Sequence, residues 1–230
     1  MHVPDGFLDA PTSVATGAVA VGALAYAMKR ARHEQPDDRT APLAGLVATF
    51  IFAAQMVNFP VGAGTSGHLL GGALAAVLVG PATAAMCVSV VLIVQALLFA
   101  DGGITALGTN ITLMAVVGVG AGWLAFRLGR AVLPKRLASV PLAAAFGAFV
   151  SVPVASLAFV GLYAVGGAAP IPLDTLTAAM VGWHSLIGLG EAVITGLVVS
   201  AVIALRPDLV YGARDVVASS PLEIREGAPL

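Results

Sequence analysis

The first two residues of the chain, Met1 and His2, together carry three nitrogen atoms that can bind one metal ion. With a metal, the Met1 amine and the backbone nitrogen of His2 close a five-membered ring, and that backbone nitrogen and Nδ1 of the His2 ring close a six-membered one. The three nitrogen atoms occupy three of the four positions of a square-planar metal site, and a second imidazole can occupy the fourth. Tetragonal nitrogen sites favour Ni²⁺ or Cu²⁺, with Co²⁺ also compatible, whereas Mg²⁺ and Ca²⁺ prefer oxygen.

The residues that follow His2 predict that this tail is held in place. The stretch "VPDGFLDAP" contains a Pro-Asp-Gly turn signal followed by the apolar pair Phe7 and Leu8. The alternative is a frayed tail with a chance histidine, but a turn and an apolar anchor favour a tail, residues 1–11, that is tucked into the protein. His68 follows the flexible stretch "GAGTSG" and is the predicted fourth ligand, with a polar helix cap as its alternative role.

Four other polar residues are candidates to support this site. Glu191 is the only carboxylate well inside a predicted span, and His184 lies two helical turns before it on the same face. A carboxylate inside the membrane is costly, so Glu191 is either protonated and hydrogen-bonded between helices or part of the network behind the metal. Asp101 and Asn110, in "FADGGITALGTN", are predicted to support the ligands from behind or to take part in coupling.

Composition shows which elements must position these residues. Apolar residues make up 59% of the 230 residues and charged ones 10%, against roughly 45–50% and 25% in soluble domains. The sequence therefore predicts an all-α polytopic membrane protein with about seven spans of about 20 residues each. The spans are residues 12–31, 41–59, 68–80, 82–100, 105–128, 138–166 and 183–205.

One of these spans, residues 68–80, is short and is separated from the next by Pro81. At about 1.5 Å per residue it does not cover a bilayer, so the alternative is a broken or tilted pair with the following span. Short, glycine-interrupted segments of this kind often line the sites of transport proteins.

The basic residues predict the orientation. All 11 Lys and Arg residues fall at or beyond those ends of the predicted spans that lie on one side of the membrane. Lys and Arg are in excess on the cytoplasmic side of membrane proteins, so this side is the cytoplasmic one. We therefore expect an outside N-terminus, a cytoplasmic tail at residues 207–230, and one transmembrane domain, residues 1–230, in the plasma (inner) membrane. No signal peptide is recognisable, so we expect the mature chain to begin at Met1.

Several functions have no motif in this sequence. It contains no Gly-rich phosphate loop, no His-Glu zinc-protease motif and no "GxSxG" elbow, so we expect no ATPase of its own and no enzyme. The single cysteine, Cys87, excludes a disulfide framework. The formal net charge of −1 gives no indication of nucleic acid, and we expect no such partner.

Five segments, in order along nearly the whole chain, resemble the CbiM/NikM family, the substrate-binding membrane components of energy-coupling-factor transporters for cobalt and nickel. They are "MHVPDGFL", "GTSGHLLGG", "QALLFADGGITALGTN", "GLGEAVITG" and "RPDLVYG". The resemblance implies a seven-helix protein that binds one Ni²⁺ or Co²⁺ through the Met1 amine, the backbone nitrogen and side chain of His2, and the His68 side chain. It implies no cofactor beyond the transported metal.

The resemblance also implies partners. Family members work in the lipid bilayer with a membrane coupling subunit, two cytoplasmic ATPases and usually a further small membrane subunit. Two alternatives remain open at this point. One is a self-sufficient secondary carrier or channel for a divalent cation, with Glu191 and His184 as a proton relay. The other is an intramembrane metal-dependent enzyme that uses His68, His184 and Glu191.

Overall fold

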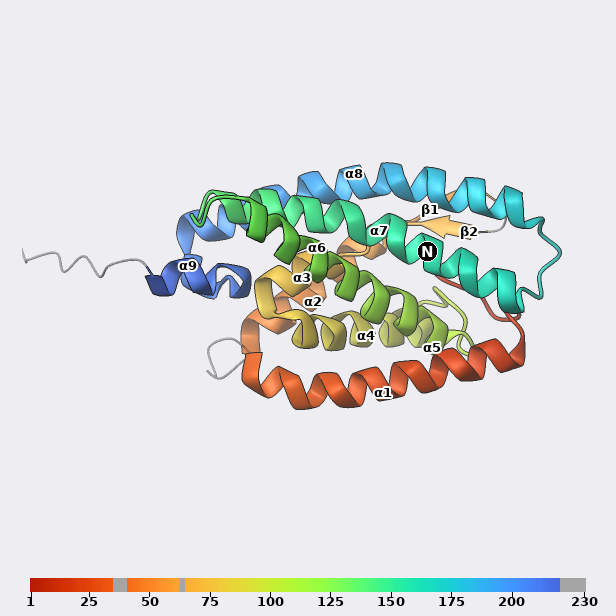
Figure 1. The fold of residues 1–230 in the computed structure, drawn as a ribbon. Helices are drawn as coiled ribbons and strands as arrows, with labels where there is room; N and C mark the ends of the chain where they lie inside the picture. Colours follow the sequence, from red (N-terminus) through yellow and green to blue (C-terminus); the bar gives the residue numbers. More distant parts are fainter. Residues whose placement is uncertain (35–40, 63–64, 220–230) are drawn as a thin grey trace, which may run out of the picture.

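The computed structural model describes residues 1–34, 41–62 and 65–219 and is mostly helical (Figure 1). Within these ranges, five helices are long and apolar enough to cross a membrane. They are α1 (Ala10–Glu34), α4 (Pro81–Leu98), the continuous helix formed by α5 (Leu107–Asn110), a π-helical stretch (Ile111–Gly118) and α6 (Val119–Val132), α7 (Ser139–Gly166) and α8 (Leu173–Leu205). These helices are those of a multi-pass membrane protein, as the composition predicts.

Two of the predicted spans are shorter than a bilayer requires. The helix α2 (Ala41–Gln55) has 15 residues, and α3 (Gly72–Val79) has 8, all of them buried. An eight-residue helix covers only about 12 Å, so α3 forms a broken pair with α4, from which Gly80 separates it with a φ of 91°. The predicted count of seven spans is therefore not confirmed, and the broken pair is the arrangement observed.

Four predicted boundaries differ from the structure by four residues or more. The third helix begins at Gly72 and not at residue 68, and the helix of the fifth predicted span ends at Val132 and not at residue 128. The last helix begins at Leu173 and not at residue 183, so His184 lies within it and not at its start. The second helix ends at Gln55 and not at residue 59, because the chain beyond it turns into a β-hairpin.

A short β-hairpin, which the sequence does not predict, interrupts the otherwise helical fold. The strand β1 (Phe59–Gly62) pairs antiparallel with β2 (Thr65–Gly67), and Pro60 lies opposite Ser66. Of the loop predicted over residues 60–67, residues 63–64 lie outside the described residues. Because β2 ends at Gly67, the hairpin leads directly into His68.

Small residues let the inner helices approach one another closely. A Cβ atom added to Gly147 of α7 would lie 2.6 Å from the carbonyl oxygen of Gly122 in α6. One added to Gly122 would lie 2.7 Å from the Cβ of Ala73 in α3. Such contacts are typical of membrane helices, which pack without a hydrophobic drive between them. They place α3 in the interior of the bundle, against α6 and α7.

A buried carboxylate that the sequence reasoning missed joins α1 to α4. Glu34, the last residue of α1, accepts hydrogen bonds from the backbone N–H groups of Ala82 and Thr83, at 3.0 and 2.8 Å. The first N–H groups of a helix lack partners within the helix, so Glu34 caps α4. Its own carbonyl oxygen accepts a bond of 2.8 Å from Arg214 at the start of α9 (Arg214–Ser219).

The helix ends fall into two groups, one at each end of the bundle, in the grouping that the basic residues predict. The last turns of α1, α6 and α8 lie together with α9 at one end of the bundle, and the turns that follow α4 and α7 lie at the other (Figure 1). Of the predicted tail, residues 207–219 form short helical turns and residues 220–230 lie outside the described residues. Which end faces the cytoplasm stays a prediction.

Candidate metal centre

The N-terminal tail is buried in the protein. Met1 is 2% exposed, and Val3 is fully buried. The Asn110 side chain holds Val3 at both backbone groups, because its Oδ1 accepts from the Val3 N–H at 2.7 Å and its Nδ2 donates to the Val3 carbonyl at 3.1 Å. The Gly103 N–H also donates to the Val3 carbonyl, at 2.9 Å. Asn110 therefore sets the position of the chain one residue after His2.

The apolar pair of the tail anchors it at α7. The ring of Phe7 packs against those of Phe159 and Tyr163, with centroid distances of 5.6 and 5.3 Å. Leu8 forms an isolated bridge with Gly167, and the Phe7 carbonyl accepts a bond of 3.0 Å from the Ala168 N–H. The turn and the anchor that "PDGFL" predicts are both observed, and they hold residues 1 and 2 inside the bundle.

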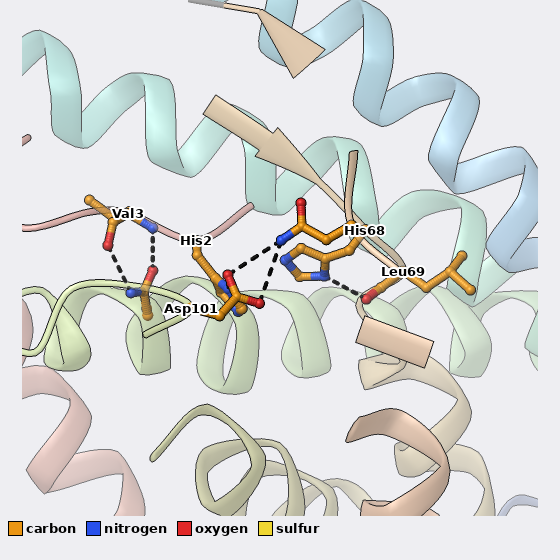
Figure 2. A network of polar contacts seen from close by, with 7 residues as sticks. His2, Val3, His68, Leu69 and Asp101 are labelled. Carbon is orange, nitrogen blue, oxygen red and sulfur yellow. Dashed lines mark hydrogen bonds and ion pairs between the residues drawn. The ribbon is translucent and has the colours of Figure 1, made fainter. Parts of the chain in front are cut away.

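His2 and His68 lie side by side. Their ring centroids are 4.5 Å apart and their planes are inclined by 43° (Figure 2). Nδ1 of His2 lies 2.6 Å from Oδ1 of Asp101, so the ring presents this nitrogen to a carboxylate. Asn58, in the chain before β1, donates to the same carboxylate at 3.3 Å. A metal that binds Nδ1 of His2 must displace this contact with Asp101.

The tautomer of His68 leaves a nitrogen available. Its Nδ1 lies 2.8 Å from the carbonyl oxygen of Leu69 (Figure 2). A carbonyl can only accept, so Nδ1 carries the proton and Nε2 has the free lone pair. Among the described residues, this buried Nε2 has no hydrogen-bond partner. A buried imidazole fixed through Nδ1 with an unpaired Nε2 is the arrangement of a metal-binding histidine.

His184 has the same arrangement. Its Nδ1 lies 2.8 Å from the carbonyl oxygen of Met180, one turn earlier in α8, and its buried Nε2 has no partner within the described part of the chain. Met180 and His184 are both buried. The sequence predicts a supporting role for His184, yet its Nε2 lone pair is as free as that of His68 among the described residues.

Glu191 holds the segment that carries His68. Its carboxylate accepts bonds from the backbone N–H groups of Leu70 and Gly71, at 2.7 and 2.9 Å. Gln55 of α2 donates to the Leu70 carbonyl at 2.8 Å. Glu191 therefore fixes the chain two and three residues after His68, and its role in metal binding stays a prediction. Gln55 was missed because a lone glutamine at a helix end carries no signal in the sequence.

Burial keeps the candidate ligands neutral. It lowers the pKa of the Met1 amine from 8.0 to about 4, although the Asp101 carboxylate acts in the opposite direction. Burial also lowers the pKa of His2 and, well below its usual range, that of His68. The Met1 amine, His2 and His184 each lower the pKa of His68 further, so the four groups lie within electrostatic range. Neutral amines and imidazoles are the forms that bind metals.

Two of the candidate nitrogen donors, the amine of Met1 and the backbone nitrogen of His2, belong to the main chain and not to side chains. Among the described residues, no three His, Cys, Asp or Glu side chains are grouped so that they could hold a metal ion. The ligand set predicted from the sequence differs from such a cluster, because it combines two imidazoles with the Met1 amine and the backbone nitrogen of His2.

A cavity of about 540 Å³ leads to this centre from the hairpin side. Its described lining includes His2, Asn58 and Asp101 and contains no Lys or Arg. A lining with a carboxylate, an imidazole and no fixed positive charge attracts cations.

The chain matches a known family over most of its length. The profile of the CbiM family, described as a cobalt uptake substrate-specific transmembrane region, matches residues 2–209. The putative fused nickel transport protein NikMN of Archaeoglobus fulgidus is 38% identical over 211 residues, which cover 91% of this chain and 68% of that protein. The cobalt transport protein CbiM of Geobacter sulfurreducens is 37% identical over 129 residues, 55% of this chain and 37% of that one.

A solved structure has the same fold. A crystal structure of a truncated transition metal transporter superimposes with a TM-score of 0.81 at 33% sequence identity and covers 89% of this chain and 99% of that one. The profile match and the shared fold lead to one conclusion: this chain is a multi-pass membrane protein that belongs to the CbiM family.

Proposed function

We propose that this chain captures one Ni²⁺ or Co²⁺ at the outer face of the plasma membrane, as the substrate-binding component of an ATP-driven energy-coupling-factor transporter. The metal is the transported substrate, and we propose no other cofactor and no enzymatic activity. The relatives named above are metal transport proteins, which supports the metal and the class of function.

The proposed ligands are the Met1 amine, the backbone nitrogen and Nδ1 of His2, and Nε2 of His68. The observation that carries this proposal is the burial of a primary amine beside two imidazoles, with Nε2 of His68 unpaired among the described residues. Burial of an ammonium group without a partner is costly. The neutral amine has a lone pair that can bind a metal, and this binding would explain why the amine is buried.

Asp101 has a defined role in this capture. Its carboxylate faces Nδ1 of His2 at 2.6 Å and lines the cavity. When the metal takes Nδ1, the single ring proton of the neutral imidazole moves to Nε2. The proton that is released comes from the backbone nitrogen of His2, and Asp101 is the proposed carrier of this proton toward the cavity. Metal binding then releases protons, as it does wherever ligands must be deprotonated.

The experiment is nickel and cobalt binding by calorimetry to purified protein that starts at Met1. One extra residue before Met1 converts the amine into an amide, and His68→Ala removes the fourth nitrogen. We expect each change to weaken binding at least a hundredfold and to remove the square-planar absorption bands of Ni²⁺. His33→Ala, on an exposed histidine at the last turn of α1, is the matched control and leaves affinity unchanged. Unchanged affinity with the extra residue would overturn the ligand set.

The proposed partners are a membrane coupling subunit, two cytoplasmic ATPases and a small membrane subunit. Sealed vesicles that contain this chain alone are expected to bind the metal and not to accumulate it, whereas vesicles with all subunits accumulate it when ATP is supplied. Accumulation by this chain alone, driven by a proton gradient, would instead support a secondary carrier. The engagement of Glu191 by two backbone N–H groups argues against its use as a proton relay.

A further inference from the structure

A second cavity, of about 380 Å³, is lined by residues of α1, α6 and α9, whose ends meet at one end of the bundle (Figure 1). It lies between the last turns of α1 and α6 and the chain that leads into α9. Three guanidinium groups line it, those of Arg127, Arg130 and Arg214, together with the single carboxylate of Asp215. The candidate metal centre has no part in this cavity.

Arg130 has a donor group that no described residue satisfies. Its side chain is only 9% exposed, and its Nη2 lies 3.3 Å from Oδ2 of Asp215. Its Nη1 is buried and, within the described residues, has no hydrogen-bond partner. A buried charged donor without a partner is strongly unfavourable. A hydrogen-bond acceptor bound in the cavity would therefore be stabilised by Nη1 of Arg130.

The other two arginines differ in how far they are engaged. Arg214 donates to the Glu34 carbonyl at 2.8 Å, and its guanidinium lies 4.5 Å from the centre of the Tyr211 ring. Arg127 is exposed at the cavity and has no such contact among the described residues. One carboxylate therefore faces three cations, and the cavity carries an excess of positive charge.

Aromatic rings form one wall of the cavity. Trp123 stacks on Phe126 and contacts Tyr211, with centroid distances of 5.2 and 5.6 Å. Tryptophan and tyrosine are enriched where the membrane meets water, at the level of the lipid headgroups. On the same turns of α6, Leu124 and Leu128 are 59% and 57% exposed, so this helix presents an apolar surface beside the cavity.

We propose that this cavity binds the phosphate group of an anionic phospholipid, with Nη1 of Arg130 and the Arg127 guanidinium as donors. Guanidinium groups match phosphate oxygens in geometry as well as in charge. Basic pockets between membrane helices commonly bind such headgroups. The aromatic wall and the exposed leucines of α6 favour a lipid over free phosphate, because they provide a surface along which acyl chains can lie.

The test uses the quenching of Trp123 fluorescence by brominated lipids. The chain has two tryptophans, so Trp183→Phe leaves Trp123 as the sole tryptophan, which is excited selectively over the tyrosines. The full-length protein is reconstituted in phosphatidylcholine vesicles that contain brominated phosphatidylglycerol or, at the same mole fraction, brominated phosphatidylcholine. We expect stronger quenching by phosphatidylglycerol. R130Q should lower this preference roughly fivefold, the factor that corresponds to about 1 kcal/mol per basic residue.

Two further variants make the result specific. R206Q removes an arginine that is exposed and paired with Asp208, and it is expected to keep the preference. D215N frees Arg130 from its carboxylate and is expected to strengthen the preference. Nickel binding and the melting temperature of R130Q show that this variant is folded.

Three results would overturn the proposal. Equal quenching by the two lipids would show that the cavity does not select an anionic headgroup. An equal loss in R206Q and R130Q would assign the preference to general surface charge. If inorganic phosphate raises the melting temperature through Arg130 while the lipids quench equally, the site takes a free anion and not a lipid.

Discussion

Asn110 uses both hydrogen-bonding groups of its amide on one backbone residue, Val3. The sequence reasoning placed it behind the metal ligands in general terms, and the structure gives it a specific task. The direction in which the chain leaves His2 depends on this pair of bonds. Asn110 is therefore one group through which the geometry of the chelate can be altered without removal of a nitrogen donor.

Asn110→Ala is expected to weaken nickel binding roughly tenfold, because it leaves two buried backbone groups of Val3 less well satisfied, at about 1–3 kcal/mol each. Calorimetry on the purified variant measures the change. Asn58→Ala, which removes an exposed amide bound to Asp101, is the control and should change affinity less. Affinity equal to that of the unaltered protein in N110A would contradict the positioning role.

The buried amine also makes stability depend on pH. Its pKa is 8.0 in the unfolded chain and about 4 in the folded one, so between these values the unfolded state binds more protons. The metal-free protein should therefore lose stability as the pH falls below 8. In the window from pH 8 to 6.5 the amine titrates in the unfolded chain, whereas His2 and His68, whose pKa values are also lowered, bind protons there mainly at lower pH.

The expected result is a melting temperature that decreases from pH 8 to pH 6.5 in protein that starts at Met1. Protein with one extra N-terminal residue has no buried amine to titrate and serves as the comparison. Parallel curves for the two proteins would show that burial of the amine is not the cause.

At the scale of elements, a connection and not a helix carries His68. The segment between β2 and α3 is held by the Glu191 carboxylate of α8 and by Gln55 of α2. Gly71 ends this segment with a φ of 74°, and a Cβ there would lie 2.8 Å from Cγ1 of Ile51. Only glycine fits this position without strain.

Gly71→Ala should thus lower both the melting temperature and the affinity for nickel, because α2 and the His68 segment must move apart. Gly190→Ala is the matched control, since a Cβ at Gly190 in α8 meets no atom within 4 Å and alanine favours a helix. A variant G71A that keeps both properties would refute the role assigned to this contact.

The elements differ in how well the sequence predicts them. The span predicted over residues 138–166 agrees with α7 to within one residue, because it is apolar, follows the basic pair Lys135 and Arg136, and precedes a stretch with two prolines, "GAAPIP". The start of α8 was missed because Asp174 and two threonines precede its apolar part. In the structure, Thr177 bonds the Leu173 carbonyl at 2.6 Å, so these polar side chains are satisfied within the helix.

The sequence indicates the candidate site where its chemistry is local. Ring sizes in adjacent residues indicate Met1 and His2 directly, and the turn and apolar pair indicate that the tail is held. The bond between Glu191 and Leu70 joins residues 121 positions apart, and hydropathy carries no information about such pairs. The hairpin was read as a loop because its strands, of 4 and 3 residues, are too short for an alternating pattern.

At the scale of the whole molecule, the two ends of the bundle differ in charge. One end holds the buried tail and a cavity whose described lining has no Lys or Arg, and the other holds the arginine-lined cavity. This separation is the basis for the predicted orientation, with the candidate metal centre on the outer side.

Cysteine labelling tests the orientation. In a Cys87→Ser background, a cysteine at Pro170, in the turn between α7 and α8, should react with a membrane-impermeant maleimide on intact cells. A cysteine at Lys135, between α6 and α7, should react only after the cells are opened. Both positions are exposed, so the reverse pattern would invert the orientation and place the candidate metal centre inside.

The bond from Glu191 to the segment after His68 has a consequence for synthesis in the cell. The ribosome makes residues 1, 2 and 68 early, but the carboxylate that holds residues 70 and 71 arrives 121 and 120 residues later, with α8. The nascent chain therefore lacks a fixed His68 segment throughout most of its insertion into the membrane. Insertion of the last helix completes the arrangement, so an aborted or truncated chain carries the histidines without the means to hold them together.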